Sequence, residues 1–261
     1  MKELYTVVTG ASQGLGKSFA YELAKRSQNL ILVSLPNENM EGLCAELQNS
    51  FAIKAHSFET DLTDKGNVLK LGQWINDNFS IKMLINNAGL GGTKKFKEAS
   101  VDYIDNIIQL NIMATCLLTR QLLSNLQEQD KGYILNISSL AAFSPIGYKT
   151  VYPASKAFIY SFSRGLNEEL KDTNVSVSVV NPGPIKTNED QIKRIKKLGF
   201  IARFTSLCPD DVAIYCLNQL EKRNTTIVVS RLSGIFLKVM PIRFGIPLLS
   251  NKIKKELNMG S

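Results

Sequence analysis

The chain has 261 residues, of which 44% are hydrophobic, and a formal net charge of +8 at pH 7. This size and composition suit a globular protein of one α/β domain or two small ones. The one histidine, His56, argues against a zinc site, which needs several His or Cys ligands, and against a Ser-His-Asp triad, since no GxSxG motif is present. We therefore expect His56 to be a strand residue without a catalytic role.

The basic charge would suit nucleic acid, an anionic surface or an anionic cofactor. No zinc-finger spacing, RNP signature or basic repeat is found, so we expect no nucleic-acid partner. The first residues, MKELYTVVTG, enter an apolar run directly and lack the pattern of a signal peptide. The four cysteines include no CxxC pair, which predicts reduced thiols and a cytoplasmic location.

Predicted strands and helices alternate along the chain. Short apolar runs such as LILVS (30–34) are typical of strands buried on both faces. Strands are expected at 4–9, 30–34, 52–58, 83–86, 133–138, 175–181 and 225–230, and helices at 17–27, 38–50, 64–78, 100–128, 152–172 and 209–221. This alternation predicts an α/β fold, a Rossmann-type doubly wound parallel sheet of about seven strands. We expect a catalytic domain over 1–230 and a basic, apolar extension of the same domain over 231–261.

A glycine-rich stretch, TGASQGLGK (9–17), separates the first predicted strand from the first predicted helix. Glycines there let the backbone approach a pyrophosphate, and the helix N-terminus offers free N–H groups. The spacing differs from the commonest dinucleotide fingerprint and from a Walker P-loop. Further motifs follow later strands: Asp61-Leu62, NNAG (86–89) and PGPIKT (182–187). Because ligands bind at the carboxyl ends of parallel strands, these motifs together predict a nucleotide site.

The stretch YPASK (152–156) puts Tyr152 and Lys156 four residues apart, on one face of a predicted helix. Such a pair can be two ordinary surface side chains. It can also be a phenol made acidic by a fixed charge, because a free tyrosine has a pKa of about 10 and a nearby ammonium favours the phenolate.

Taken together, TGASQGLG, Asp61-Leu62, NNAG, Asn111, Ser139, YPASK and PGPIKT resemble the short-chain dehydrogenase/reductase family in order and spacing, over residues 4 to about 230. The likeness is to members that resemble 3-ketoacyl reductases. It implies four catalytic residues, Asn111, Ser139, Tyr152 and Lys156. Tyr152 would act as general acid or base, Ser139 would donate to the substrate oxygen, and Lys156 would also hold the nicotinamide ribose. Asn111 would anchor a water that feeds protons to Lys156, or form a kink or buried hydrogen bond.

The resemblance also implies a nicotinamide dinucleotide cofactor. The residues expected to contact it are Gly10, Ser12, Gly14, Leu15, Gly16, Ser34, Asp61, Leu62, Asn87, Ala88, Gly89, Tyr152, Lys156, Pro182, Gly183, Ile185 and Thr187. After the second strand, Ser34 to Asn37 contain neither the acid typical of NAD enzymes nor the base typical of NADP enzymes. Without an acid to repel a 2′-phosphate, we expect NADP(H) to be favoured over NAD(H), although Gln13 stands where many NADP-using members have a basic residue.

We therefore expect an NAD(P)-dependent reductase of a 3-ketoacyl or other apolar ketone. The alternatives are an NAD-dependent alcohol dehydrogenase and a non-catalytic NADP-binding regulator. A homodimer or tetramer is expected. The segment between 187 and 209 would form a basic substrate lid. The tail, 231–256, could cover the substrate pocket, pack in a dimer or make peripheral membrane contact, and a pocket role is favoured because its apolar residues need burial.

Overall fold

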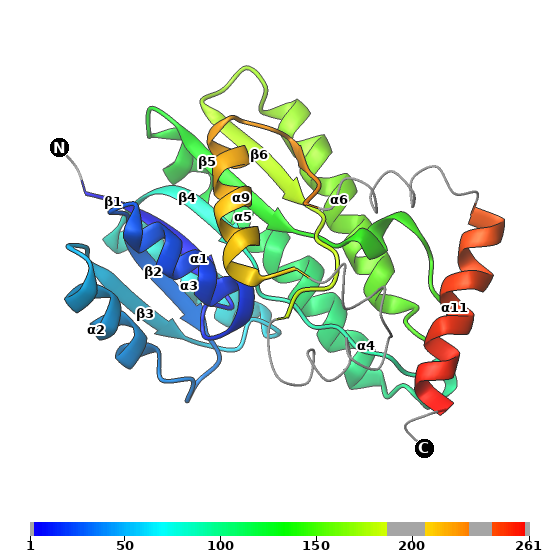
Figure 1. Cartoon of the computed structure of the whole chain (residues 1–261). Coiled ribbons are helices and arrows are strands. Elements are labelled where there is room, and N and C mark those ends of the chain that lie inside the picture. Colours follow the sequence, from blue (N-terminus) through cyan, green and yellow to red (C-terminus); the bar gives the residue numbers. More distant parts are fainter. Residues whose placement is uncertain (1–2, 187–206, 230–241, 259–261) are drawn as a thin grey trace.

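The computed structural model describes residues 3–186, 207–229 and 242–258 (Figure 1). Most of the predicted lid, including Thr187, and the first part of the tail lie outside the described residues. In the described part, seven parallel strands form one sheet in the order β3-β2-β1-β4-β5-β6-β7. The strands are β1 (Leu4–Thr9), β2 (Asn29–Ser34), β3 (Ala55–Glu59), β4 (Ser80–Asn86), β5 (Gly132–Ile137), β6 (Val175–Val180) and β7 (Thr226–Ile227).

The strand order reverses at β1, which pairs with β2 on one side and β4 on the other. This reversal is the topological switch point of a doubly wound sheet, where ligands bind beyond the carboxyl ends of the strands. The predicted Rossmann-type fold is therefore confirmed.

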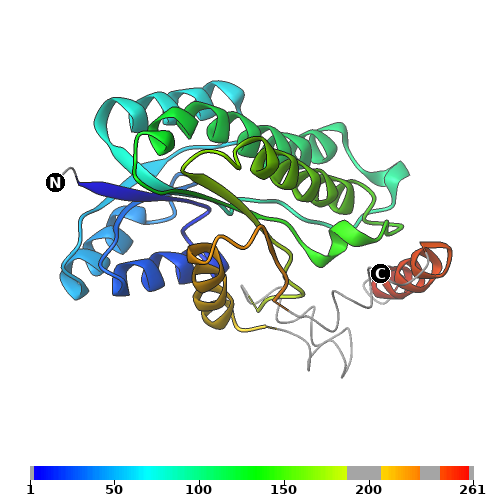
Figure 2. The same cartoon turned by 90° about the horizontal axis from the view of Figure 1, so that it is seen from above.

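Helices cover both faces of the sheet (Figures 1 and 2). One face carries α1 (Gly14–Lys25), α2 (Met40–Ser50) and α9 (Pro209–Glu221), and the other carries α3 (Lys65–Asn78), α5 (Thr115–Gln127) and α6 (Val151–Glu169). The remaining elements are η1 (Phe96–Glu98), α4 (Val101–Ile108), η2 (Gln109–Ala114), η3 (Leu140–Phe143) and α11 (Ile242–Asn258).

Strand β2 shows why the sequence builds a two-sided core. Leu30 and Leu32 pack into the core beneath α1, α2 and α9, while Ile31 and Val33 pack into the core on the opposite face. Alternate side chains of a strand point to opposite faces, so a strand covered by helices on both sides is apolar over most of its length.

Several predicted boundaries differ from the structure. The first helix begins at Gly14 instead of residue 17, and the last strand contains only Thr226 and Ile227. The fourth strand begins at Ser80 because Lys82, which interrupts its apolar run, is accommodated as a half-buried side chain. The helix predicted over 100–128 is divided by a π-helical turn, η2, between α4 and α5.

His56 lies in β3, as predicted for a strand histidine. Its ring packs against the rings of Tyr5 and Phe79, with centroids 5.7 and 5.0 Å apart. Within the ranges described above, no helix combines the length and the hydropathy that a bilayer crossing requires.

Candidate active site

A cavity of about 1010 Å³ lies at the carboxyl end of the sheet. Such a volume lies at the upper end of the range of about 300–1,000 Å³ that is typical of small-molecule sites. The structure brings most of the predicted site residues into its wall: Gly10, Ser12, Gly14, Leu15, Ser34, Asp61, Leu62, Asn87, Ala88, Gly89, Ser139, Tyr152, Lys156, Pro182, Gly183 and Ile185.

The glycine turn between β1 and α1 forms one part of this wall. Gly10 has φ +66°, and a Cβ there would come within 2.9 Å of the Ala88 Cα. The turn therefore requires glycine both for its backbone conformation and for its closeness to the end of β4. Gln13 at the N-cap of α1 makes no side-chain capping bond, and the first turn contains no acidic residue. The positive end of the helix dipole is thus available to an anion in the cavity.

Gly16 is placed differently from the prediction, because it does not line the cavity. A Cβ at Gly16 would lie 2.0 Å from the carbonyl oxygen of Gly10. The residue must be glycine so that α1 can pack directly against the turn. Gly16 thus supports the glycine turn without lining the cavity itself.

Asn87 and Thr9 hold the ends of β1 and β4 together. The Asn87 side-chain amide donates to the carbonyl oxygens of Thr9 (2.9 Å) and Gly10 (3.1 Å). The Thr9 hydroxyl oxygen accepts from the backbone N–H groups of Asn87 and Ala88, both at 3.0 Å. These bonds hold the glycine turn against the end of β4.

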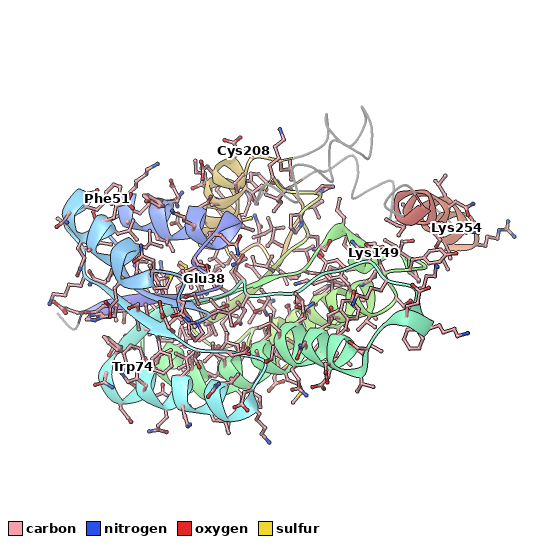
Figure 3. The ribbon with its side chains drawn as sticks, turned by 90° about the horizontal axis from the view of Figure 1, so that it is seen from below. Glu38, Phe51, Trp74, Lys149, Cys208 and Lys254 are labelled. Atoms are coloured by element: carbon pink, nitrogen blue, oxygen red, sulfur yellow. The ribbon has the colours of Figure 1, made fainter. Side chains whose placement is uncertain are left out.

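An acidic residue that the sequence prediction missed lines the other end of the cavity. Glu38 lies in the loop after β2 (Figure 3). It lines the cavity together with Ser34 and Asp61. The Ser34 hydroxyl donates to the carbonyl oxygen of Leu35 at 2.9 Å, and the Asp61 carboxylate accepts from the hydroxyl and N–H of Thr63. Glu38 falls four residues beyond β2, outside the positions where an acid is usually sought.

Tyr152 and Lys156 lie on the first turns of α6 and face the cavity. Lys156 is only 5% exposed, and its ammonium donates to the Ile137 carbonyl oxygen at 2.8 Å. The Lys156 Nζ lies 5.9 Å from the centroid of the Tyr152 ring. Burial disfavours the charged form and lowers the pKa of Lys156 to about 8.

Two adjacent serines follow β5, and the structure distinguishes them. Ser138 is buried, and its hydroxyl donates to the Lys156 carbonyl oxygen at 2.7 Å. Ser139 caps η3: its oxygen accepts from the N–H of Ala141 at 3.1 Å. Because an accepting hydroxyl still has its own hydrogen to donate, Ser139 can offer that hydrogen toward the cavity.

Asn111 lies behind the cavity wall, on the π-helical turn η2, and is 1% exposed. Its side chain accepts from the N–H of Leu90 (2.7 Å) and donates to the Leu90 carbonyl oxygen and to the Ser155 hydroxyl, both at 2.9 Å. The Ser155 hydroxyl in turn donates to the Tyr152 carbonyl oxygen at 2.8 Å. Asn111 therefore connects the loop after β4 to the first turn of α6, as a buried hydrogen-bonding residue. π-Helical turns are often found at functional sites.

Apolar side chains form the part of the wall beyond Tyr152. Leu90, Leu110 and Ile146 lie there with Leu249 and Ile253 of α11. The helix is attached by a hydrogen bond from the N–H of Gly147 to the hydroxyl of Ser250, at 2.7 Å. The sequence favours a pocket role for the tail over a dimer or membrane contact, and Leu249 and Ile253 lie in the cavity wall.

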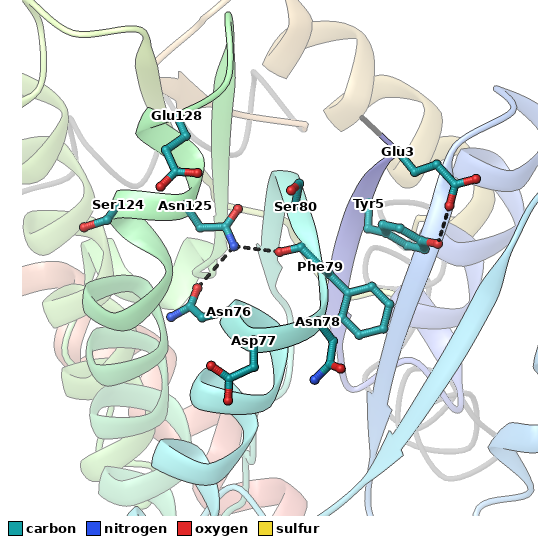
Figure 4. Close-up of a pocket in the computed structure, with 10 residues that line it drawn as sticks. All are labelled: Glu3, Tyr5, Asn76, Asp77, Asn78, Phe79, Ser80, Ser124, Asn125 and Glu128. Carbon is teal, nitrogen blue, oxygen red and sulfur yellow. Dashed lines mark hydrogen bonds between the residues drawn. The ribbon is translucent and has the colours of Figure 1, made fainter. Parts of the chain in front are cut away.

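A second cavity, of about 560 Å³, lies at the opposite edge of the sheet, near the first residues of β1 and β4 (Figure 4). The side-chain amide of Asn125 lines this cavity and donates to the side-chain oxygen of Asn76 (3.2 Å) and to the carbonyl oxygen of Phe79 (2.8 Å). These bonds join α5 to α3 and its following loop. Among the residues that the structure describes, no cluster of His, Cys, Asp or Glu suits a metal ion. The cavity with Tyr152 is thus the candidate active site.

Comparison with known proteins identifies the family. A family model described as short chain dehydrogenase matches residues 5–197. The chain belongs to the short chain dehydrogenase family. A very-long-chain 3-oxoacyl-CoA reductase from Anas platyrhynchos is 34% identical over 196 residues, which are 73% of this chain and 62% of that relative. This short chain dehydrogenase therefore matches less than two thirds of the length of the relative.

Solved structures of other dehydrogenases share the fold. One from Sphingobium yanoikuyae, in complex with NADPH, is 26% identical with a TM-score of 0.79, covering 87% of this chain and 88% of that one. A bulky-bulky ketone specific alcohol dehydrogenase from Comamonas testosteroni is 24% identical with a TM-score of 0.77, covering 99% and 95%. At that identity the likeness shows the fold alone.

Proposed function

We propose that this short chain dehydrogenase reduces an apolar ketone, of the 3-ketoacyl type or similar, to an alcohol with a nicotinamide dinucleotide as the reductant. The observation that carries the proposal is the juxtaposition of Tyr152, Ser139 and buried Lys156 in one cavity with the glycine turn. The likeness to a 3-oxoacyl-CoA reductase supports the ketone class.

The cavity wall formed by the glycine turn, the start of α1 and Asp61 fits a dinucleotide. The tight turn at Gly10 and the uncapped N-terminus of α1 suit a pyrophosphate, and the polar wall at Asp61 suits an adenosine. Lys156 and Tyr152, in the same wall, would hold the nicotinamide ribose. When bound, the reduced cofactor supplies a hydride to the carbonyl carbon.

Residues of the chain would supply the proton to the carbonyl oxygen and stabilise the negative charge that develops there. Tyr152 donates its phenolic proton to the carbonyl oxygen, and Ser139 donates a hydrogen bond to that oxygen as negative charge develops. The ammonium of Lys156 stabilises the phenolate that remains on Tyr152. Asn111 positions α6 through Ser155, and a water relay from Asn111 to Lys156 stays part of the proposal.

We propose NADP(H) as the preferred cofactor. Ser34 to Asn37 contain no acid, and the structure from Sphingobium yanoikuyae holds NADPH. Glu38, in the cavity wall, disfavours NADP(H), since its carboxylate would repel a 2′-phosphate. Substitution of Glu38 is the direct test of this repulsion.

A second candidate function is a non-catalytic regulator that binds the cofactor without chemistry. Asn111 is connected through Ser155 to Tyr152, beside Lys156, and Ser139 lines the same cavity. This arrangement disfavours the regulator, because binding alone needs no polarised phenol. Wild-type protein with saturating cofactor and a panel of ketones distinguishes the two functions.

The Tyr152→Phe substitution tests the proposal. It removes only the phenolic O–H, so we expect kcat to fall by roughly 10²–10⁴-fold, the usual contribution of a general acid. Cofactor affinity, measured by fluorescence titration, should stay near that of the wild type. Tyr160→Phe is the matched control, because Tyr160 lies on the same helix outside the cavity wall. A Tyr152→Phe protein with wild-type kcat contradicts the catalytic assignment.

A further inference from the structure

Lys149 brings a positive charge into the part of the cavity where a substrate would lie. It precedes α6 by two residues, is half-buried and lines the wall. Its Nζ lies 5.1 Å from the centroid of the Tyr152 ring. Neither the family pattern nor the proposed reaction uses this residue.

The two lysines beside Tyr152 are placed differently. Lys156 is nearly inaccessible and its ammonium is held by the carbonyl oxygen of Ile137. Lys149 lies in the segment before the helix, next to Ile146, and the neighbouring Tyr148 carbonyl oxygen accepts from the backbone N–H of Lys94 at 2.8 Å. The loop that contains Lys149 is therefore joined to the loop after β4, on the apolar side of the cavity.

Charge is distributed unevenly across the cavity. In the described wall the acidic residues are Glu38, after β2, and Asp61, after β3. Lys149 and Lys156 lie on the other side of β1, near β5 and α6. The substrate side of the described wall thus contains cationic groups and no carboxylate, an arrangement that favours an anionic ligand. Figure 3 shows Lys149 on the side of the molecule near α11, well apart from Glu38.

We propose that Lys149 binds an anionic group of the substrate while Leu249 and Ile253 contact its apolar chain. This inference rests on the proposed function and specifies its substrate class: a ketone that combines an apolar chain with a negative charge. The charge can be the carboxylate of an oxo acid or a phosphate of a carrier thioester. Both are oxyanions that accept a charge-assisted hydrogen bond from an ammonium.

A role for Lys149 in polarising the Tyr152 phenol is less consistent with its position. Lys149 is more exposed than Lys156, and solvent weakens the effect of a charge on a neighbouring group. An electrostatic role would also affect every ketone alike, whereas anion binding affects only charged substrates. This difference provides the test.

The experiment compares three substrates of equal chain length: an oxo acid, the corresponding coenzyme A thioester and a neutral methyl ketone. The measured quantity is the ratio of kcat/KM for each charged substrate to that for the neutral ketone. A charge-assisted hydrogen bond contributes about 1.5–3 kcal/mol, so we expect Lys149→Met to lower that ratio by roughly 10- to 100-fold. Lys149→Arg, which keeps the charge, should retain much of the ratio.

Lys171→Met is the matched control, because Lys171 lies exposed just beyond the far end of α6 and its removal changes the net charge equally. The ratio should stay at the wild-type value in this variant, and thermal melting should show that each variant folds. A fall confined to the acid identifies a carboxylate, and a fall confined to the thioester identifies a phosphate; both support the proposal.

An unchanged ratio in Lys149→Met overturns the inference. So does an equal loss for all three substrates with a shifted pH profile, which would place Lys149 in the polarisation of Tyr152. If the wild type binds the cofactor but turns over none of these or other ketones, the proposed function itself fails, and this outcome is distinct from a failure of the Lys149 inference alone.

Discussion

Burial of the Lys156 side chain gives the site a titratable cation close to neutral pH. The desolvated ammonium has its pKa lowered to about 8, so in the cofactor-free protein it is charged below that pH and increasingly neutral above it. An anionic cofactor stabilises the charged form and therefore raises this pKa on binding. Cofactor binding should consequently take up a proton in the alkaline range.

We predict that cofactor affinity falls as the pH rises through about 8. Between about pH 8 and pH 9 the loss should be about fivefold, because the charged fraction of Lys156 in the free protein falls from roughly a half to roughly a tenth. Calorimetric titration in buffers of different ionisation enthalpy would measure the proton uptake directly. Lys156→Met should bind more weakly and show a flatter pH profile. An affinity that is constant over this range would show that the charge of Lys156 is not linked to binding.

The loop between β2 and α2 is the element on which the proposed cofactor preference depends, because Leu35 and Glu38 of this loop line the cavity. Glu59 of β3 holds it, accepting from the backbone N–H groups of Asn37 (3.1 Å) and Met40 (3.3 Å). Asn37 and Asn39 have φ values of 67° and 53°, in the left-handed region that asparagine tolerates better than most residues. This fixed loop places Glu38 in the cavity wall beside Ser34.

We predict that Glu38→Gln raises the affinity for NADPH relative to NADH by roughly three- to tenfold at low salt, and by less at high salt, because the repulsion of a 2′-phosphate is partly screened. Ser34→Asp should shift the preference toward NADH. Glu41→Gln removes the same charge from the first turn of α2, outside the cavity wall, and should leave the ratio unchanged. Competitive fluorescence titration would measure both cofactors. An equal rise in the NADPH-to-NADH affinity ratio in Glu38→Gln and Glu41→Gln would mean that the net charge of the protein, and not the position of Glu38, sets the preference.

Among the secondary-structure elements, the strands and the main helices were predicted well from the sequence. Their apolar patterns reflect burial in a sheet that helices cover on both faces. The residues that follow β4, Asn87 to Gly89, lie in the cavity wall, because the carboxyl ends of parallel strands share one edge of the sheet. The π-helical turn at Asn111 was not predicted, since a local shift in backbone hydrogen bonding leaves the apolar spacing almost unchanged. Glu38 and Lys149 were missed because their places depend on how loops fold back on the cavity.

Over the whole molecule, α11 brings a segment distant in sequence to the candidate active site. Leu249 and Ile253 are four residues apart and therefore share a helix face, and that face lies on the cavity wall. Ser250 attaches the same region to Gly147, five residues before Tyr152. Leu248 is 59% exposed and lies outside that wall. This arrangement favours the pocket role of the tail, while the expected homodimer or tetramer remains a prediction from the family resemblance.

We predict that the double substitution Leu249→Ala and Ile253→Ala raises KM for long-chain ketones by about tenfold and changes KM for short-chain ketones much less. The reason is that each buried methylene group contributes about 0.8 kcal/mol, and only a long chain reaches the helix. Leu248→Ala is the control on the same helix and should behave as the wild type in this assay. Steady-state kinetics over a series of chain lengths would measure the effect.

The membrane alternative predicts a different outcome for the same variants. Exposed Leu248, with Arg243 and Lys254 also exposed on α11, would then contact anionic lipid, and Leu248→Ala would weaken co-sedimentation with phosphatidylserine vesicles in a salt-dependent way. If α11 serves the pocket, Leu248→Ala should leave sedimentation unchanged, and only the inner pair should affect chain-length selectivity. An equal rise in KM for short and long ketones in the Leu249→Ala, Ile253→Ala protein would contradict the pocket role. Loss of sedimentation in Leu248→Ala would then assign the helix to the membrane surface.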